Sequence, residues 1–104
     1  MDNNESLRES TAEILALAGY EVSQASGPDQ ALDQLGGGNI DLLLLDLGLE
    51  GQGLQVLEDA TNLPIVIGTS GSKREFSDPR VCAFLPKPFA PDLLLAEVVR
   101  WLSA

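Results

Sequence analysis

The sequence predicts an α/β domain in which helices cover both faces of a parallel β-sheet. Segments with apolar residues at helical spacing alternate along the chain with short runs that are apolar at every position. Such runs are typical of parallel strands that are buried on both faces. A chain of 104 residues also has the length of one domain. We therefore expect residues 1–104 to fold as a single doubly wound unit.

The first half of the chain carries two helical patterns around one extended pattern. Apolar residues recur at helical spacing over 6–18, and Gly19 is a stop signal for that helix. The residues of 20–25 then alternate between apolar and polar, which predicts a strand with one covered face. The second helix is expected to begin at Pro28 and to end at the triple glycine of 36–38.

The second half of the chain contains three continuous apolar runs. The run 42–45 consists of four leucines between two aspartates. It is too short for a helix and predicts a central strand. A helix with apolar residues at helical spacing should follow over 51–60, and further buried strands are expected at 65–67 and 81–85. The amphipathic segment 90–102 should form the last helix.

The charge and the composition exclude several classes of protein. Sixteen acidic residues against six basic residues give a net charge of -10, and histidine is absent. An acidic surface repels phosphate backbones and anionic lipids, so we expect no direct binding of nucleic acid or membranes. Without histidine, Ser-His-Asp catalysis and histidine-ligated zinc are excluded. The single cysteine excludes a disulfide framework and suits a cytoplasmic location.

Polar side chains follow three of the expected strands. Asp46, Thr69 and Lys87 stand at or just after strand ends, and the acidic segment 2–5 precedes the first helix. Because the carboxyl ends of parallel strands meet at one edge of a sheet, these groups should converge. Carboxylates bind divalent cations, an ammonium and a hydroxyl bind phosphoryl oxygens, and a carboxylate can form an acyl phosphate. The pattern therefore predicts the handling of a phosphoryl group with a divalent metal.

Five segments carry a family resemblance and span nearly the whole chain. They are GYEV (19–22), ALDQL (31–35), DLLLLDLGL (41–49), LPIVIGTS (63–70) and FLPKPF (84–89). Together, and in this order, they resemble the receiver domain of two-component response regulators. The resemblance implies a flavodoxin-like fold that accepts a phosphoryl group on aspartate from a histidine kinase or a histidine phosphotransfer protein, with Mg²⁺ as cofactor. It implies self-phosphorylation and autodephosphorylation at most, without independent substrate turnover.

The resemblance also assigns roles to single residues. Asp46 matches the phosphoacceptor, Thr69 the switch hydroxyl and Lys87 the signature lysine of the family. Phe84 falls at the position of the switch aromatic residue, and Pro88 resembles the family's cis proline, a structural position. These five roles are what the resemblance implies.

The same resemblance implies a set of ligands for Mg²⁺. The acidic pair that follows the first strand in the family corresponds to Asp2 and Asn3. The other expected ligands are the carboxylate of Asp46 and the backbone carbonyl of Gly48.

The sequence departs from the family pattern at four places. Asn3 replaces the second acid of the pair, which should weaken Mg²⁺ binding. Glu50 adds a negative charge in the loop after the phosphoacceptor, and this loop is one residue shorter than usual. The polar segment 68–79 leaves room for about one turn of helix, so the fourth helix should be short. Only Met1 precedes Asp2, so the first strand of the family fold is missing.

The missing strand has three possible explanations. Its absence would leave buried amides without partners, and each of these costs about 1–3 kcal/mol. In the first, the sequence is a fragment or has a misplaced start, as in a receiver module cut from a hybrid sensor kinase. In the second, another chain supplies the strand, as in a homodimer. In the third, the remaining strands re-pair. We favour the first explanation.

Two functions of different classes follow from the residues. The leading interpretation is a phospho-accepting receiver domain, with output through protein contact or through onward relay. The alternative is a pseudo-receiver that keeps the fold as a protein-interaction module without phosphorylation; Asn3 and Glu50 favour it. An independent phosphatase on a similar fold is disfavoured, because the sequence has no insertion that would bind a substrate.

Overall fold

The computed structural model describes residues 1–2, 4–48, 51–71 and 78–103. Within these residues a parallel sheet of three strands has the order β1-β2-β3. The strands are β1 (Leu42–Asp46), β2 (Ile65–Ser70) and β3 (Ala83–Pro86). In this register Asp46 lies opposite Thr69. The end of β1 is therefore beside the end of β2.

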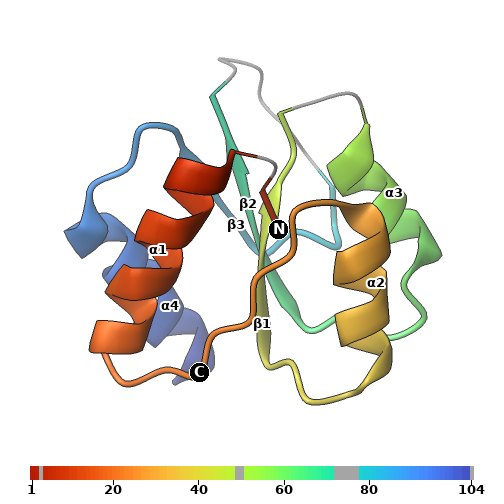
Figure 1. Cartoon of the computed structure of the whole chain (residues 1–104), viewed down its shortest axis with the longest axis horizontal. Coiled ribbons are helices and arrows are strands. Elements are labelled where there is room, and N and C mark those ends of the chain that lie inside the picture. Colours follow the sequence, from red (N-terminus) through yellow and green to blue (C-terminus); the bar gives the residue numbers. More distant parts are fainter. Residues whose placement is uncertain (3, 49–50, 72–77, 104) are drawn as a thin grey trace.

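Helices cover both faces of the sheet, as Figure 1 shows. The helices α1 (Glu5–Leu17) and α4 (Pro91–Leu102) lie on one side of the strands, and α2 (Pro28–Gly36) and α3 (Gln52–Asp59) lie on the other. This is the doubly wound, flavodoxin-like α/β arrangement that the sequence predicts.

The four leucines of β1 serve two cores, because successive side chains of a strand point to opposite faces. Leu43 and Leu45 pack in a cluster with residues of α2 and α3. Leu42 and Leu44 pack against a second cluster, which contains residues of α4. A strand between two helical layers needs apolar residues at every position, which explains the unbroken leucine run.

One expected strand is absent. The prediction of a strand over Tyr20–Ala25 is wrong, because none of these residues is in a strand. Their alternation of apolar and polar residues is correct for a strand, but among the residues that the structure describes the sheet ends at β1 and no strand lies beside them. An extended segment without a ladder partner is not a strand.

Other expected boundaries shift by a few residues. The strand expected over 81–85 begins at Ala83, and Cys82, which the strand prediction places in the core, is exposed. Strand β2 continues to Ser70, so the polar segment expected to begin at residue 68 starts later. The short helix expected within the polar segment 68–79, which is not the α4 of Figure 1, falls largely on residues 72–77, and these lie outside the described residues.

Residues 1–2 partly occupy the place of the missing strand. Before Leu42 the described residues contain no strand. The α-amino group of Met1 donates to the carbonyl of Leu44, and the carbonyl of Met1 accepts from the N–H of Asp46 at 2.9 Å. On the other side the N–H of Asp2 donates to the carbonyl of Ala25 at 3.1 Å. The described strands do not re-pair across this gap, which excludes the third explanation above.

In the described ranges, every helix is too short or too polar to cross a bilayer.

Candidate functional site

Three strand ends bring the expected catalytic residues together. Asp46 is the last residue of β1, and Thr69 lies opposite it in β2. Lys87 directly follows β3, and its N–H donates to the carbonyl of Ser70 at 2.8 Å. Asp46 and Thr69 are only 6% and 3% exposed. The edge of the sheet thus holds a buried carboxylate, a buried hydroxyl and a lysine, as the sequence predicts.

The ammonium of Lys87 contacts two carboxylates. Its Nζ lies 2.7 Å from Oδ2 of Asp2 and 3.4 Å from Oδ2 of Asp46. The side chains of Lys87 and Asp2 are 17% and 12% exposed, so both are largely withdrawn from water. Charge-assisted bonds of this kind are stronger than neutral ones. A residue near the amino terminus and one near the last helix therefore meet at the carboxylate of Asp46.

Backbone contacts fix the position of Asp2. Its Oδ1 accepts from the N–H of Asn4 at 2.9 Å, which leaves Oδ2 for Lys87. Its carbonyl accepts from Nη1 of Arg8 at 3.0 Å. Asn4 in turn caps α1, because its side-chain oxygen accepts from the N–H of Leu7 at 3.1 Å. The start of α1 thus orients the carboxylate.

Gly48 lies close to the other oxygen of Asp46. Its N–H donates to Oδ1 of Asp46 at 2.9 Å. A Cβ atom at position 48 would lie 3.1 Å from Oγ of Ser70 and 3.2 Å from that Oδ1. Both separations are tighter than ordinary van der Waals contact. Position 48 therefore suits glycine because the backbone must approach the carboxylate closely.

Gly53 of α3 lies directly against the backbone of Asp46. A Cβ atom at this position of α3 would collide with the backbone carbonyl of Asp46 and would lie 2.9 Å from Cδ2 of Leu47. The glycine lets the first turn of α3 pack directly on the end of β1. The sequence pattern alone does not assign this role to Gly53.

The residues present fit a divalent cation. Asp2 and Asp46 already share one positive charge, that of Lys87, so both carboxylates can reach a single cation. Carboxylate and carbonyl oxygens are the ligands that Mg²⁺ prefers. Gly48 lies beside Asp46, whereas the fourth expected ligand, Asn3, lies outside the described residues. Within the described residues no group of three or more acidic or cysteine side chains is assembled.

The remaining expected residues lie within β3 and just after it. Phe84 lies opposite Gly68 in the register and is half-buried. Among the described residues it belongs to neither core cluster. The peptide bond between Lys87 and Pro88 is cis. The roles of Phe84 as a switch and of Pro88 as a structural residue stay predictions, and Glu50 lies outside the described residues.

Two groups that the sequence analysis did not assign also lie here. Ser70 follows Thr69 and places its hydroxyl near Gly48. The α-amino group of Met1 is the second, and burial lowers its pKa to about 6, although the charges of Asp2 and Asp46 partly offset this effect. The sequence does indicate that Ser70 could lie at the site, because Ser70 is a second hydroxyl residue directly after Thr69 at the end of a strand. The α-amino group carries no such signal.

Comparisons with known proteins agree with this geometry. The response regulator receiver domain family matches residues 1–99. A sensor kinase/phosphatase for the CAI-1 autoinducer, CqsS of Vibrio cholerae, is 34% identical over 98% of this chain, which spans 17% of that protein. The response regulator MprA of Mycobacterium tuberculosis is 32% identical over 94% of this chain, which spans 46% of it. The solved structure of the response regulator TrrA of Thermotoga maritima, in complex with Mg²⁺ and BeF, is 28% identical with a TM-score of 0.79 and covers 96% of this chain and 93% of its own.

Proposed function

Because this chain belongs to the family of response regulator receiver domains, we propose that it accepts a phosphoryl group on Asp46. Receiver domains work in two-component systems, where they interact with histidine kinases or histidine phosphotransfer proteins. The observation that carries the proposal is the meeting of Asp46, Thr69 and Lys87 at one sheet edge. The proposed donor is the phosphohistidine of such a kinase or phosphotransfer protein.

The two oxygens of Asp46 have different surroundings, which suggests how the transfer proceeds. The N–H of Gly48 holds Oδ1, while Oδ2 faces the ammonium of Lys87. Oδ2 attacks the phosphorus, the bond from phosphorus to the imidazole nitrogen breaks, and its electron pair stays on that nitrogen, which takes a proton from water. Lys87 stabilises the negative charge of the transferred oxygens.

Thr69 and Phe84 would respond to the new phosphate. Thr69 lies opposite Asp46, so its hydroxyl is placed to donate to a phosphoryl oxygen there. Movement of this loop would let Phe84 repack, because Phe84 is on the neighbouring strand. A local change of charge would thus bias a two-state element.

Mg²⁺ is the proposed cofactor. Asp2, Asp46, the carbonyl of Gly48 and Asn3 would hold it, and when bound it neutralises charge on the phosphoryl oxygens. The approach of both carboxylates to the single ammonium of Lys87 supports this assignment. We also propose a cytoplasmic location, which the net charge of -10 and the single cysteine support.

Intact mass after incubation with Mg²⁺ and a small phosphodonor such as acetyl phosphate tests the proposal. The parent should gain the mass of one phosphoryl group, and an Asp46→Asn variant should gain none. Both proteins must first show a cooperative urea transition, so that a negative result does not reflect unfolding. A folded parent without a mass gain would overturn the proposal and favour a protein-interaction module.

A further inference from the structure

Leu47 directly follows Asp46, and its side chain lies between two glycines. Its Cδ2 atom lies 2.9 Å from the position that a Cβ atom would take at Gly53 of α3. Its Cδ1 atom occupies the place of a Cβ atom at Gly68 of β2, so any other residue at position 68 would collide with it. Both glycines are buried. The side chain of Leu47 therefore fills a notch between α3 and β2, whose two walls are these glycines.

The notch needs glycine for its space and not for its backbone conformation. The backbone of Gly53 and of Gly68 lies outside the left-handed region. Glycine inside a strand weakens the strand, and it often marks a close approach of another group. At Gly68 the approaching group is the side chain of Leu47. The two glycines thus form a specific seat for this one side chain.

The backbone around Leu47 continues into the candidate site on both sides. The N–H of Leu47 donates to the carbonyl of Thr69 at 2.7 Å. The N–H of Gly48 donates to Oδ1 of Asp46 at 2.9 Å, which is an Asx turn over residues 46–48. The Asx turn leaves Oδ2 of Asp46 for Lys87. The seat of Leu47 therefore holds the turn that gives the two carboxylate oxygens of Asp46 different surroundings.

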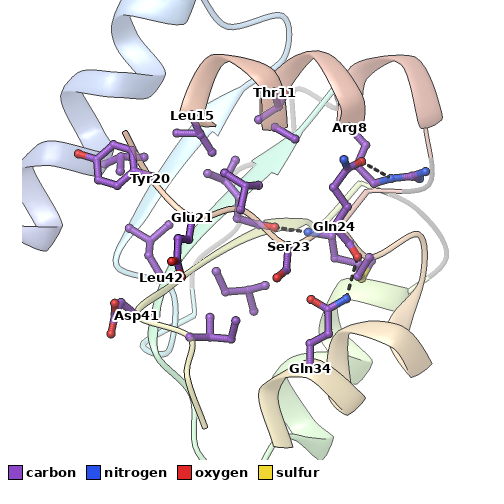
Figure 2. Close-up of a pocket in the computed structure, with 18 of the residues that line it drawn as sticks. Arg8, Thr11, Leu15, Tyr20, Glu21, Ser23, Gln24, Gln34, Asp41 and Leu42 are labelled. Carbon is purple, nitrogen blue, oxygen red and sulfur yellow. Dashed lines mark hydrogen bonds between the residues drawn. The ribbon is translucent and has the colours of Figure 1, made fainter. Parts of the chain in front are cut away.

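The opposite flank of the site is less densely packed. A cavity of about 570 Å³ lies between α1, the segment 20–25 and β1, and Figure 2 shows residues of all three parts around it. Asp2 and Thr69 line this cavity. Leu47 is not among the described residues that line it, and packs instead against the cluster with residues of α2 and α3. The apolar packing that can hold the Asx turn in place thus comes from the side of the notch.

We propose that Leu47 is a positioning residue for phosphoryl transfer. Seated between Gly53 and Gly68, it keeps Oδ1 of Asp46 on the N–H of Gly48, so that Oδ2 is the oxygen that attacks. This inference rests on the proposed function of Asp46 as the phosphoacceptor. A displacement of about 1 Å can slow a reaction about 100-fold. Loss of the seat should therefore slow the transfer, in addition to weakening the core.

The experiment compares the parent with Leu47→Ala, Gly68→Ala and the double variant Leu47→Val/Gly68→Ala. The matched control is Leu35→Ala, which removes a leucine side chain from the same cluster at α2. The readouts are the hydrogen-exchange protection of the Gly48 amide and the rate of phosphoryl mass gain from acetyl phosphate with Mg²⁺. Urea denaturation first shows that each protein is folded.

Both single changes at the notch should lower both readouts at least about tenfold, because each removes Leu47 from its seat. Leu35→Ala should leave both readouts within about twofold of the parent, although it also lowers the free energy of unfolding. In the double variant the shorter valine leaves room for the new methyl group at position 68. Both readouts should then return to within about threefold of the parent, which a general loss of packing would not produce.

Three outcomes would overturn the proposal. Unchanged protection of the Gly48 amide in Leu47→Ala would show that Leu47 only packs. An equal slowing in Leu35→Ala, or no recovery in the double variant, would show that the seat has no specific effect. If Gly68→Ala does not fold, the comparison of Leu47→Ala with Leu35→Ala decides alone. A folded parent without a mass gain would overturn the function proposed for Asp46, whereas protection of Gly48 would still decide whether Leu47 holds the turn.

Discussion

The two edges of β1 differ in how completely they are built. The edge towards β2 is paired along five positions, and Leu45, Val66 and Ile67 beside it are fully buried. Within the described part of the chain, the edge towards the segment 20–25 meets Met1 and a cavity. Four similar leucines thus have very different surroundings. The comparison teaches that pairing along one edge is enough to keep β1 a strand, whereas the extended segment 20–25, which has the correct pattern but no partner, stays irregular.

The candidate site spans both regions. Asp46 and Thr69 belong to the paired side, and their separation is fixed by the ladder between β1 and β2. Asp2 belongs to the other side, where residues 1–2 hold their place through three backbone bonds. Asp46, the proposed phosphoacceptor, is therefore better supported by the fold than Asp2, which would share the proposed metal ion with it.

The largest expected effect compares two leucines of β1. Leu45→Ala should lower the free energy of unfolding by about 2–5 kcal/mol, because the side chain of Leu45 is fully buried in the cluster with α2 and α3. Leu44→Ala should lower it by less than half as much, because Leu44 lines the cavity and is partly exposed. Urea denaturation measures both. Equal losses would show that the cavity beside Leu44 does not weaken the packing of this side chain.

The next effect tests the contact between α3 and the end of β1. Gly53→Ala should lower the free energy of unfolding by about 1–3 kcal/mol, because the new methyl group would collide with the carbonyl of Asp46. Gly36→Ala is the matched control in a helix. It has open space at its Cβ position and should be neutral or stabilising by at most about 1 kcal/mol. A tolerated Gly53→Ala would mean that α3 can move away from the site.

The third effect concerns competition between the ammonium of Lys87 and Mg²⁺ for the carboxylates of Asp2 and Asp46. In a Lys87→Ala variant Mg²⁺ should raise the melting temperature more than in the parent, because the metal would replace the ammonium between Asp2 and Asp46. A tenfold gain in affinity corresponds to up to about 1.4 kcal/mol of added stability. Thermal unfolding in MgCl2, against NaCl of equal ionic strength, measures it. An equal rise of the melting temperature in both proteins would show that Lys87 does not compete with Mg²⁺ for these carboxylates.

The smallest expected effect concerns the ion pair between Asp78 and Arg80. Arg80 donates to both carboxylate oxygens of Asp78 and lowers the pKa of Asp78 from 3.8 to about 2. A lowered pKa stabilises the fold above the ordinary value, and this contribution is lost as pH falls through about 2. Asp78→Asn should therefore differ from the parent slightly at neutral pH and not at all below that range. A large difference at pH 7 would contradict the small contribution expected of an ion pair whose arginine side chain is 38% exposed to water.

The sequence predicts the paired region well and the other region poorly, for a physical reason. Unbroken apolar runs and strand-end polar residues are local signals, so β1, β2 and the group of Asp46, Thr69 and Lys87 could be recognised. The state of 20–25 depends on a neighbour that is distant in sequence, and its alternation alone cannot supply one. The preference of Lys87 for Asp2 over Asp46 depends on the exact path of residues 1–2. No pattern of residues encodes that distance.

The position of Lys87 links phosphorylation to the anchoring of the chain's first residues. One ammonium serves Asp2 at 2.7 Å and Asp46 at 3.4 Å. An acyl phosphate on Asp46 would compete with Asp2 for that same positive charge. The stronger its hold on Lys87, the more weakly the residues that lead into α1 are tied to the rest of the molecule. Phosphorylation of Asp46 would therefore weaken the contact that holds Asp2 to Lys87.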